Sequence, residues 1–288
     1  MNSQEVNESI RRAARLLAGA HALVLVAGAG MGIDSGLPDF RGREGFWQAY
    51  PALGRQRVGF ADIASPEAFR SNPRLAWGFY GHRLALYRTT RPHAGFHILR
   101  RWMDESLLGG AVFTSNVDGQ FQQAGFDSRL LVECHGSIHH LQCLDACGPE
   151  IWAADDFSPD VDADSGLLRG DLPRCPHCAA LARPNVYMFD DFDWLDRRVR
   201  EQRQRLEHWL RSVDRLLVIE IGAGTAIASA RDFTHRMAFE LGAPVIRINP
   251  REAAIHGSPR HVSLPMGALQ ALQAIDQALA GADTSLLD

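Results

Sequence analysis

Five short apolar segments alternate with stretches of helical pattern along the 288-residue chain, and this alternation limits the fold more than any other feature. The segments are nearly continuous apolar runs that stop at glycine, asparagine or another loop-forming residue. Such runs are typical of strands buried on both faces, and strands that alternate with helices form a parallel sheet covered on both sides. The expected strands cover residues 21–30, 110–116, 129–136, 215–224 and 243–250, with a weaker candidate at 185–189, and helical stretches such as 9–17, 93–105 and 196–212 lie between them.

Two stretches interrupt this alternation. Residues 43–91 contain Trp, Tyr and Phe at helical spacings, and residues 143–182 contain four of the five cysteines. No internal repeat or low-complexity linker sets them apart, so we expect insertions into one sheet domain rather than separate units. The predicted fold class is therefore α/β, a Rossmann-like parallel sheet with helices on both faces, plus a helical insertion and a small cysteine-containing module. The sheet domain is expected to comprise residues 1–42, 92–142 and 183–288.

The charge balance and the hydropathy pattern argue against two classes of partner. The chain has 34 acidic and 30 basic side chains, a formal charge of −4 and a pI near 6.3, whereas binding to a nucleic-acid backbone needs clustered Lys and Arg. The longest wholly apolar or glycine stretch, residues 22–30, falls far short of the roughly 20 residues of a membrane helix. The first residues are polar and then helical, without the pattern of a signal peptide. We expect a cytoplasmic protein with no nucleic-acid or membrane partner, and the sequence indicates no particular oligomeric state.

A glycine-rich loop follows the first expected strand. Residues 28–32 read Gly-Ala-Gly-Met-Gly, and glycines let backbone N–H groups come close to a pyrophosphate. The loop is not the dehydrogenase fingerprint, which needs glycine where Ile33 stands. From the loop alone, nucleotide binding and a tight turn without a ligand are equal alternatives.

Four cysteines form two close pairs. Three residues separate Cys143 from Cys147, and two separate Cys175 from Cys178. This spacing lets four thiolates converge on one tetrahedral zinc ion, and a closed set of four leaves no coordination position for a substrate. Free thiols are the alternative, because disulfides are disfavoured in a cytoplasmic chain. The fifth cysteine, Cys134, is expected to be a small buried apolar residue, and the histidines near enough to replace a cysteine ligand are His139, His140 and His177.

Several motifs occur in the order and at the spacing of the sirtuin family. The segment GAGMGIDSGLPDFRG, residues 28–42, resembles the sirtuin signature, in which GAG is followed after several residues by G-I-P-D-F-R. The run T-S-N-V-D at 114–118 resembles the family's T-Q-N-[IV]-D, and His135-Gly136 resembles its catalytic H-G. The run R-P-N-V at 183–186 with Phe189 resembles the approach to its substrate loop. The segments Gly222–Thr225 and Ile248-Asn249 stand where the family has G-T-S and I-N, so the resemblance extends over most of the chain.

The resemblance implies an NAD-dependent protein-lysine deacylase that uses NAD and a structural Zn²⁺ and acts on acylated lysine in a protein or peptide. In the sirtuin reaction the acyl oxygen attacks the ribose C1′ as nicotinamide leaves, and a histidine then activates a ribose hydroxyl. The products are free lysine and O-acyl-ADP-ribose. The domain of residues 1–42, 92–142 and 183–288 would then bind NAD, and residues 143–182 would form the zinc-binding module.

The resemblance also assigns roles to single residues. The histidine of the reaction is His135, which ends an apolar strand before a glycine; an unperturbed imidazole, with a pKa of about 6.5, takes up a proton near neutrality. Asp118 would meet the nicotinamide amide, with Asn116 beside it, whereas the motif alone is more common as an Asx turn. The implied cofactor contacts are Gly28, Ala29, Gly30, Asp39, Phe40, Arg41, Ser115, Asn116, Asp118, Gly222, Gly224, Thr225 and Asn249.

A second short motif concerns the acyl group. Tyr80 and Arg83 are three residues apart in a helical stretch and therefore share one helix face. A phenol and a guanidinium in an acyl pocket would bind a carboxylate. The pair resembles the Y-x-x-R of sirtuins that remove malonyl and succinyl groups; the alternative is a core tyrosine beside a solvated arginine. The substrate contacts implied are Tyr80, Arg83, Val186 and Phe189.

The chain departs from the family pattern at several positions. Ser115 replaces Gln, Gly32 stands where Ser is usual, Gly224 falls on the Ser of G-T-S, and residues 189–191 read F-D-D in place of F-G-E. These departures leave two other functions open: an NAD-dependent mono-ADP-ribosyltransferase or NAD glycohydrolase, and a non-catalytic module that binds NAD or ADP-ribose. The three carboxylates within residues 190–193 either favour cationic targets or form a solvated turn. Glu220 needs a basic partner, because an unpaired charge within a buried strand is costly.

Overall fold

The computed structural model describes residues 2–38 and 42–284, and its centre is a six-stranded parallel sheet. The strands lie in the order β11-β10-β9-β1-β2-β3, and every neighbouring pair is parallel. Each of the five segments that the sequence predicts as strands contributes one strand, which confirms the expected parallel sheet. The bounds are β1 Ala22–Ala27, β2 Gly110–Thr114, β3 Leu131–Glu133, β9 Leu216–Ile221, β10 Val245–Ile248 and β11 Val262–Leu264.

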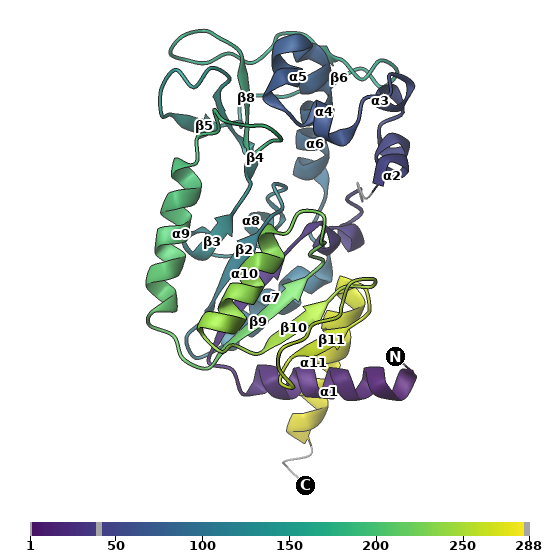
Figure 1. The fold of residues 1–288 in the computed structure, drawn as a ribbon, viewed down its shortest axis with the longest axis vertical. Helices are drawn as coiled ribbons and strands as arrows, with labels where there is room; N and C mark the ends of the chain where they lie inside the picture. The colour runs from purple at the N-terminus through teal and green to yellow at the C-terminus, as the bar shows by residue number, and fades with distance from the viewer. Residues whose placement is uncertain (1, 39–41, 285–288) are drawn as a thin grey trace.

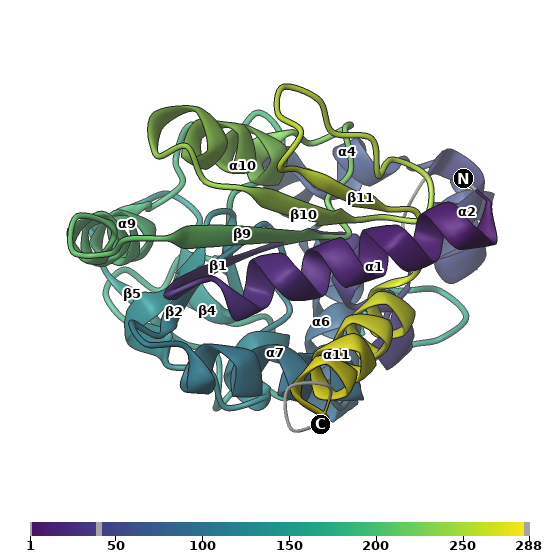
Figure 2. The same cartoon turned by 90° about the horizontal axis from the view of Figure 1, so that it is seen from below.

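Separate sets of helices cover the two faces of the sheet (Figure 2). Every residue of β1 and β9 is buried, because alternate side chains enter the cores on opposite faces. Helices α1, α7 and α11 cover one core, and α9 and α10 cover the other. No helix within the described residues combines the length and apolar character needed to cross a membrane. The bounds are α1 Ser3–Ala18, α7 Ala94–Glu105, α9 Arg197–Leu210, α10 Ser229–Glu240 and α11 Ala268–Thr284, so the helices expected at 9–17, 93–105 and 196–212 are confirmed.

A second part of the molecule lies beyond the carboxyl ends of the parallel strands (Figure 1). Its core is rich in aromatic side chains, and the indole Nε1 of Trp77 on α6 donates a hydrogen bond of 2.9 Å to the carbonyl of Ala182. An antiparallel sheet in the order β5-β4-β8 and the β6-β7 ribbon complete this part. The bounds are α2 Gly42–Ala49, α3 Pro51–Arg55, α4 Phe60–Ile63, α5 Pro66–Ser71, α6 Pro73–Thr89, β4 Gly136–Cys143, β5 Ile151–Ala153, β6 Asp160–Val161, β7 Leu168–Arg169 and β8 Ala182–Val186.

The remaining elements lie outside the pattern that the sequence predicts. The weak strand expected at 185–189 overlaps β8, but β8 pairs antiparallel with β4 and is not part of the parallel sheet. The expected boundaries of the helical insertion, 43–91, and of the cysteine module, 143–182, stay a prediction. Short turns of helix lie in the connections: η1 Ala29–Met31, η2 Ile33–Ser35, α8 Gln120–Gln123 and η3 Ser128–Leu130.

Glu220, the charged residue inside β9, has the basic partner that its burial requires. Arg247 stands opposite it on the neighbouring strand β10. The Nε atom of Arg247 lies 2.6 Å from one carboxylate oxygen, and Nη2 donates a hydrogen bond of 3.1 Å to the other. A two-point ion pair of this kind offsets much of the desolvation of two buried charges.

Candidate functional site

Two glycine loops meet backbone to backbone at the carboxyl edge of the sheet. The Gly30 amide donates to the Gly222 carbonyl over 3.0 Å. A Cβ added at Gly28 would lie 2.7 Å from the Cα of Ala223, and one at Gly222, where φ is +64°, would lie 2.4 Å from the carbonyl carbon of Gly30. Any side chain at Gly28 or Gly222 would push the loops apart. Ala29 is exposed and Gly30 is half-buried, so the first loop keeps backbone accessible where an open parallel sheet binds its ligands.

Two asparagines hold these loops from the neighbouring strands. The side-chain amide of Asn116, after β2, donates to the Gly28 carbonyl over 3.0 Å. The side-chain amide of Asn249, after β10, donates to the Ala223 carbonyl over 2.9 Å, and its oxygen accepts the backbone N–H groups of residues 251 and 252. Asn249 is completely buried. Both asparagines therefore fix the loops that the resemblance assigns to NAD.

The other predicted cofactor contacts are distributed around these loops. The Ser115 amide donates to the Ala27 carbonyl over 3.0 Å, and its half-buried side chain follows β2. Gly224 is half-buried and Thr225 is exposed, with the Thr225 hydroxyl donating to Glu252 over 2.7 Å. The predicted contacts Asp39, Phe40 and Arg41 lie outside the described residues.

Asp118 is a buried carboxylic acid in the loop after β2. Burial raises the pKa of Asp118 to about 6, although its hydrogen bond from the Gln120 amide lowers it. The Glu133 charge raises this pKa further and the Arg83 charge lowers it. Asp118 thus forms the Asx turn that is common for its motif, but in an apolar setting that disfavours its charge.

His135 lies in the loop after β3, the strand beside β2, so it and Asp118 follow adjacent strands at one edge of the sheet. Burial lowers the pKa of His135, more than a hydrogen bond with the Ser115 backbone raises it. Its Nε2 atom lies 2.9 Å from the Ser229 hydroxyl oxygen. The residue after it must be glycine, because a Cβ at Gly136 would lie 2.0 Å from the Asn185 carbonyl oxygen. At neutral pH the imidazole is therefore largely uncharged and able to accept a proton.

The predicted acyl pair, Tyr80 and Arg83, is buried on α6. The Nε and Nη2 atoms of Arg83 donate hydrogen bonds of 2.9 and 2.8 Å to the Tyr87 hydroxyl, and the guanidinium lies over the rings of Phe79, Tyr80 and Tyr87. Burial raises the pKa of Tyr80 to about 12, so its phenol stays protonated. Tyr87 was not predicted, although it stands four residues after Arg83 and so shares its helix face.

The segment from Val186 to Phe189 runs past His135. The amide of Tyr187 donates to the carbonyl of His135 over 2.9 Å. Val186 is buried, whereas Phe189 is 39% exposed and its ring meets that of Phe60 edge-on at 5.8 Å.

The acidic residues at 190–193 do not form one solvated cluster. Asp191 is buried and makes two hydrogen bonds of 2.7 Å with the guanidinium of Arg183, which is also buried. Asp193 lies 3.0 Å from Arg70. Neither alternative, three carboxylates available to a cationic target or a solvated turn, holds for Asp191, because this side chain pairs with an internal arginine.

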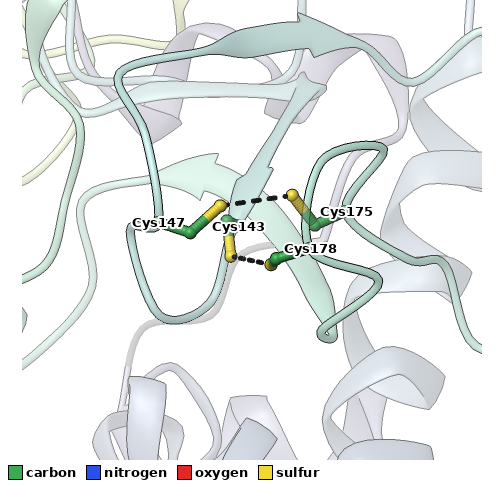
Figure 3. Close-up of side chains that lie close together, drawn as sticks. All are labelled: Cys143, Cys147, Cys175 and Cys178. Atoms are coloured by element: carbon green, nitrogen blue, oxygen red, sulfur yellow. Dashed lines mark hydrogen bonds between the residues drawn. The ribbon is translucent and has the colours of Figure 1, made fainter.

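Four cysteine side chains converge from the end of β4, the loop after it and the loop before β8 (Figure 3). Their sulfur atoms all lie within 4.8 Å of one another, with Cys143 to Cys178 at 3.7 Å and Cys147 to Cys175 at 3.6 Å. A regular tetrahedron with Zn–S bonds of about 2.3 Å has edges of about 3.8 Å, whereas a disulfide needs about 2.05 Å. The four thiols therefore fit a closed zinc site, and no histidine ligand is needed.

The sequence also named three histidines that could replace a cysteine ligand, and each has a different environment in the structure. His139 Nε2 lies 2.9 Å from the Asp118 carbonyl oxygen, and His177 lies 2.8 Å from Glu150. Burial lowers the pKa of His140 to about 4. Cys134 is buried as expected, and burial raises the pKa of its thiol to about 12, so it is unreactive.

Comparison with known proteins agrees with this arrangement. The model of the Sir2 family matches residues 28–228. A protein of Pyrococcus abyssi described as an NAD-dependent protein deacylase is 32% identical over 84% of this chain and 87% of its own length. One of Aeropyrum pernix with the same description is 31% identical over 94% of this chain and 98% of its own length.

Solved structures show the same fold. One structure, reported as a basis for the mechanism and regulation of Sir2 enzymes, superimposes with a TM-score of 0.68 at 26% identity. The match covers 95% of this chain and 98% of that chain. A Sir2 homologue in complex with NAD superimposes with a TM-score of 0.67 over 94% of each chain, at 22% identity.

When the protein is purified without chelator, we expect one zinc ion per chain. Elemental mass spectrometry measures this ratio of zinc to protein. Cys175→Ser and Cys178→Ser should lose that zinc and unfold at lower temperature, because structural zinc binding is coupled to folding. Cys134→Ala is the matched control and should keep its metal. Full zinc content in the Cys178→Ser variant would contradict the four-sulfur site.

Asp118→Asn should stabilise the fold at pH 7.5. A pKa raised from 3.8 to about 6 means that the native state disfavours the ionised carboxylate by about 3 kcal/mol above pH 6. The penalty falls as the pH drops from 6 to below 3.8, so the gain of about 1–3 kcal/mol in unfolding free energy at pH 7.5 should be about a third as large at pH 4.5.

Denaturant unfolding at pH 7.5 and pH 4.5 measures this difference. Asp104→Asn, whose side chain is 70% exposed, is the control and should change stability by less than about 0.5 kcal/mol. A loss of stability for Asp118→Asn at pH 7.5 would contradict this prediction, because it would show that native-state interactions stabilise the ionised carboxylate.

Proposed function

Because this chain belongs to the Sir2 family, we propose that it is an enzyme, an NAD-dependent protein-lysine deacylase, with a preference for acyl groups that carry a carboxylate. The observation that carries the proposal is the placement of Asp118 and His135 on loops after adjacent strands, beside two interlocked glycine loops. Nicotinamide dinucleotide supplies the glycosidic bond whose cleavage drives acyl transfer.

The residues of the chain support each part of this reaction. The glycine loops leave backbone close to the place where a pyrophosphate would bind, and Asn116 fixes the first loop. Asp118 offers a carboxyl group in an apolar setting, suited to hydrogen bonds with the nicotinamide amide. His135 is mainly neutral at pH 7 and takes up the proton of a ribose hydroxyl. General-base catalysis of this kind contributes roughly 10²–10⁴-fold.

The acyl preference rests on the side chains around Arg83. A guanidinium always carries its charge, and Arg83 is buried among the rings of Phe79, Tyr80 and Tyr87. In such a setting a carboxylate of a succinyl or malonyl group gains charge-assisted hydrogen bonds that an acetyl group cannot make. The Arg83 charge also lowers the pKa of Asp118, so the guanidinium acts electrostatically on the carboxyl group proposed to meet nicotinamide.

The protein is expected to release O-acyl-ADP-ribose and bare lysine when incubated with NAD and acetyl-, succinyl- or lipoyl-lysine peptides, followed by mass spectrometry. His135→Ala should abolish deacylation, and His208→Ala, on the exposed part of α9, should not. Release of ADP-ribose without peptide, or its attachment to protein, would favour a transferase or glycohydrolase. NAD binding without nicotinamide release would favour a non-catalytic module.

Arg83→Met should lower kcat/KM for the succinyl peptide roughly 10- to 100-fold and change that for the acetyl peptide less than about 3-fold, because only the acidic acyl group loses a charge-assisted contact. Arg83→Lys should give an intermediate loss, since it keeps the charge but not the planar fork. Arg129→Met, at a side chain that is 84% exposed, is the control. Equal losses for both peptides in Arg83→Met would reject the acyl preference.

A further inference from the structure

Ser229 contacts the imidazole of His135, and the sequence motifs give it no role. It is the first residue of α10, and its hydroxyl oxygen lies 2.9 Å from His135 Nε2. The two residues are 94 positions apart in the chain. The contact joins the loops that follow β3 and β9.

The imidazole is held on two sides. The hydrogen bond with the Ser115 backbone raises the pKa of His135, so in that bond the ring donates to a carbonyl oxygen. A serine hydroxyl can donate to a neutral ring nitrogen and accept from a protonated one. Ser229 can therefore keep its hydrogen bond both before and after His135 takes up a proton.

The fold holds Ser229 in this place independently of His135. Arg231, two residues later on α10, donates hydrogen bonds of 2.9 and 2.8 Å to the carbonyls of Ala223 and Glu252. These bonds tie the first turn of α10 to the second glycine loop and to the loop after β10. The position of the hydroxyl therefore follows from the packing of the loops rather than from the contact itself.

We propose that Ser229 relays the proton in acyl transfer: its hydroxyl gives its own proton to Nε2 of His135, and its oxygen takes up the proton of the ribose hydroxyl. The inference rests on the proposed deacylase function and extends it to a residue outside the family motifs of this chain. In the expected reaction His135 acts only after nicotinamide has left. Ser229 should thus affect the later steps and leave the release of nicotinamide unchanged.

Ser229→Ala is expected to lower kcat for deacylation roughly 10²- to 10⁴-fold, because the ribose proton no longer reaches His135 and the contribution of general-base catalysis is lost, with KM for NAD and for the peptide changed less than about 2-fold. Exchange of labelled nicotinamide into NAD, which reports the earlier step, should stay at the wild-type rate. Ser229→Thr should restore most of the lost kcat, because it returns the hydroxyl. Ser212→Ala, an exposed serine whose hydroxyl donates to the Trp209 carbonyl, is the matched control and should resemble the wild type.

The outcomes separate the inference from the function on which it rests. Wild-type protein that deacylates no peptide contradicts the proposed function. Active wild-type protein with unchanged deacylation by Ser229→Ala overturns the inference. A parallel loss of exchange and deacylation that threonine does not rescue also overturns it, because it shows a purely structural role for the start of α10. Independently of turnover, the ¹⁵N NMR signal of His135 Nε2 should shift in Ser229→Ala, and an unchanged signal contradicts the contact.

Discussion

The backbone contact between the two glycine loops determines the geometry at the carboxyl edge of the sheet. Strands β1 and β9 are neighbours in register, with Ala27 opposite Ile221, so the loops that follow them begin side by side. They remain in contact because Gly28 and Gly222 have no Cβ. Asn116 and Asn249, from the strands on either side, then bond to carbonyls of these loops. Hydrogen bonds thereby join four loops at this edge of the sheet, and the bonds of Arg231 connect the start of α10 to them.

Two buried acid–base pairs among the described residues contrast with the buried carboxyl group at which chemistry is proposed. Arg183 and Asp191 share two hydrogen bonds, and Glu220 and Arg247 form a two-point pair across adjacent strands. Asp118 instead has a raised pKa, because its burial outweighs one backbone hydrogen bond and the charge of Arg83. Acids with such shifts concentrate at functional sites. The contrast between paired and poorly compensated carboxylates distinguishes the structural charges of the fold from the proposed catalytic one.

Local pattern was sufficient for five of the six strands of the parallel sheet, but not for β11 or for the contacts between distant segments. The five main strands are runs of apolar residues, so their burial on both faces could be read directly. Strand β4 mixes histidine, serine and glutamine with apolar residues, and β11 has only three residues, so neither shows a clear period. The cysteine cluster was predictable because thiol spacing has few uses. The pairing of Asp191 with Arg183 and the contact of Ser229 with His135 depend on how loops pack, which no local pattern contains.

The absence of lysine from these 288 residues limits which molecules can be substrates of the proposed reaction. All 30 basic residues are arginines, and these 288 residues contain no lysine. For the internal pairs this is favourable, since a planar guanidinium can bond both oxygens of Asp191 in parallel, whereas an ammonium acts as a point charge. For the function, a lysine deacylase acts on an amide of an ε-amino group, and none of these side chains can carry one. The chain therefore presents no acyl-lysine to its own site or to that of a second copy, and the proposed reaction can take its acyl group only from a different molecule.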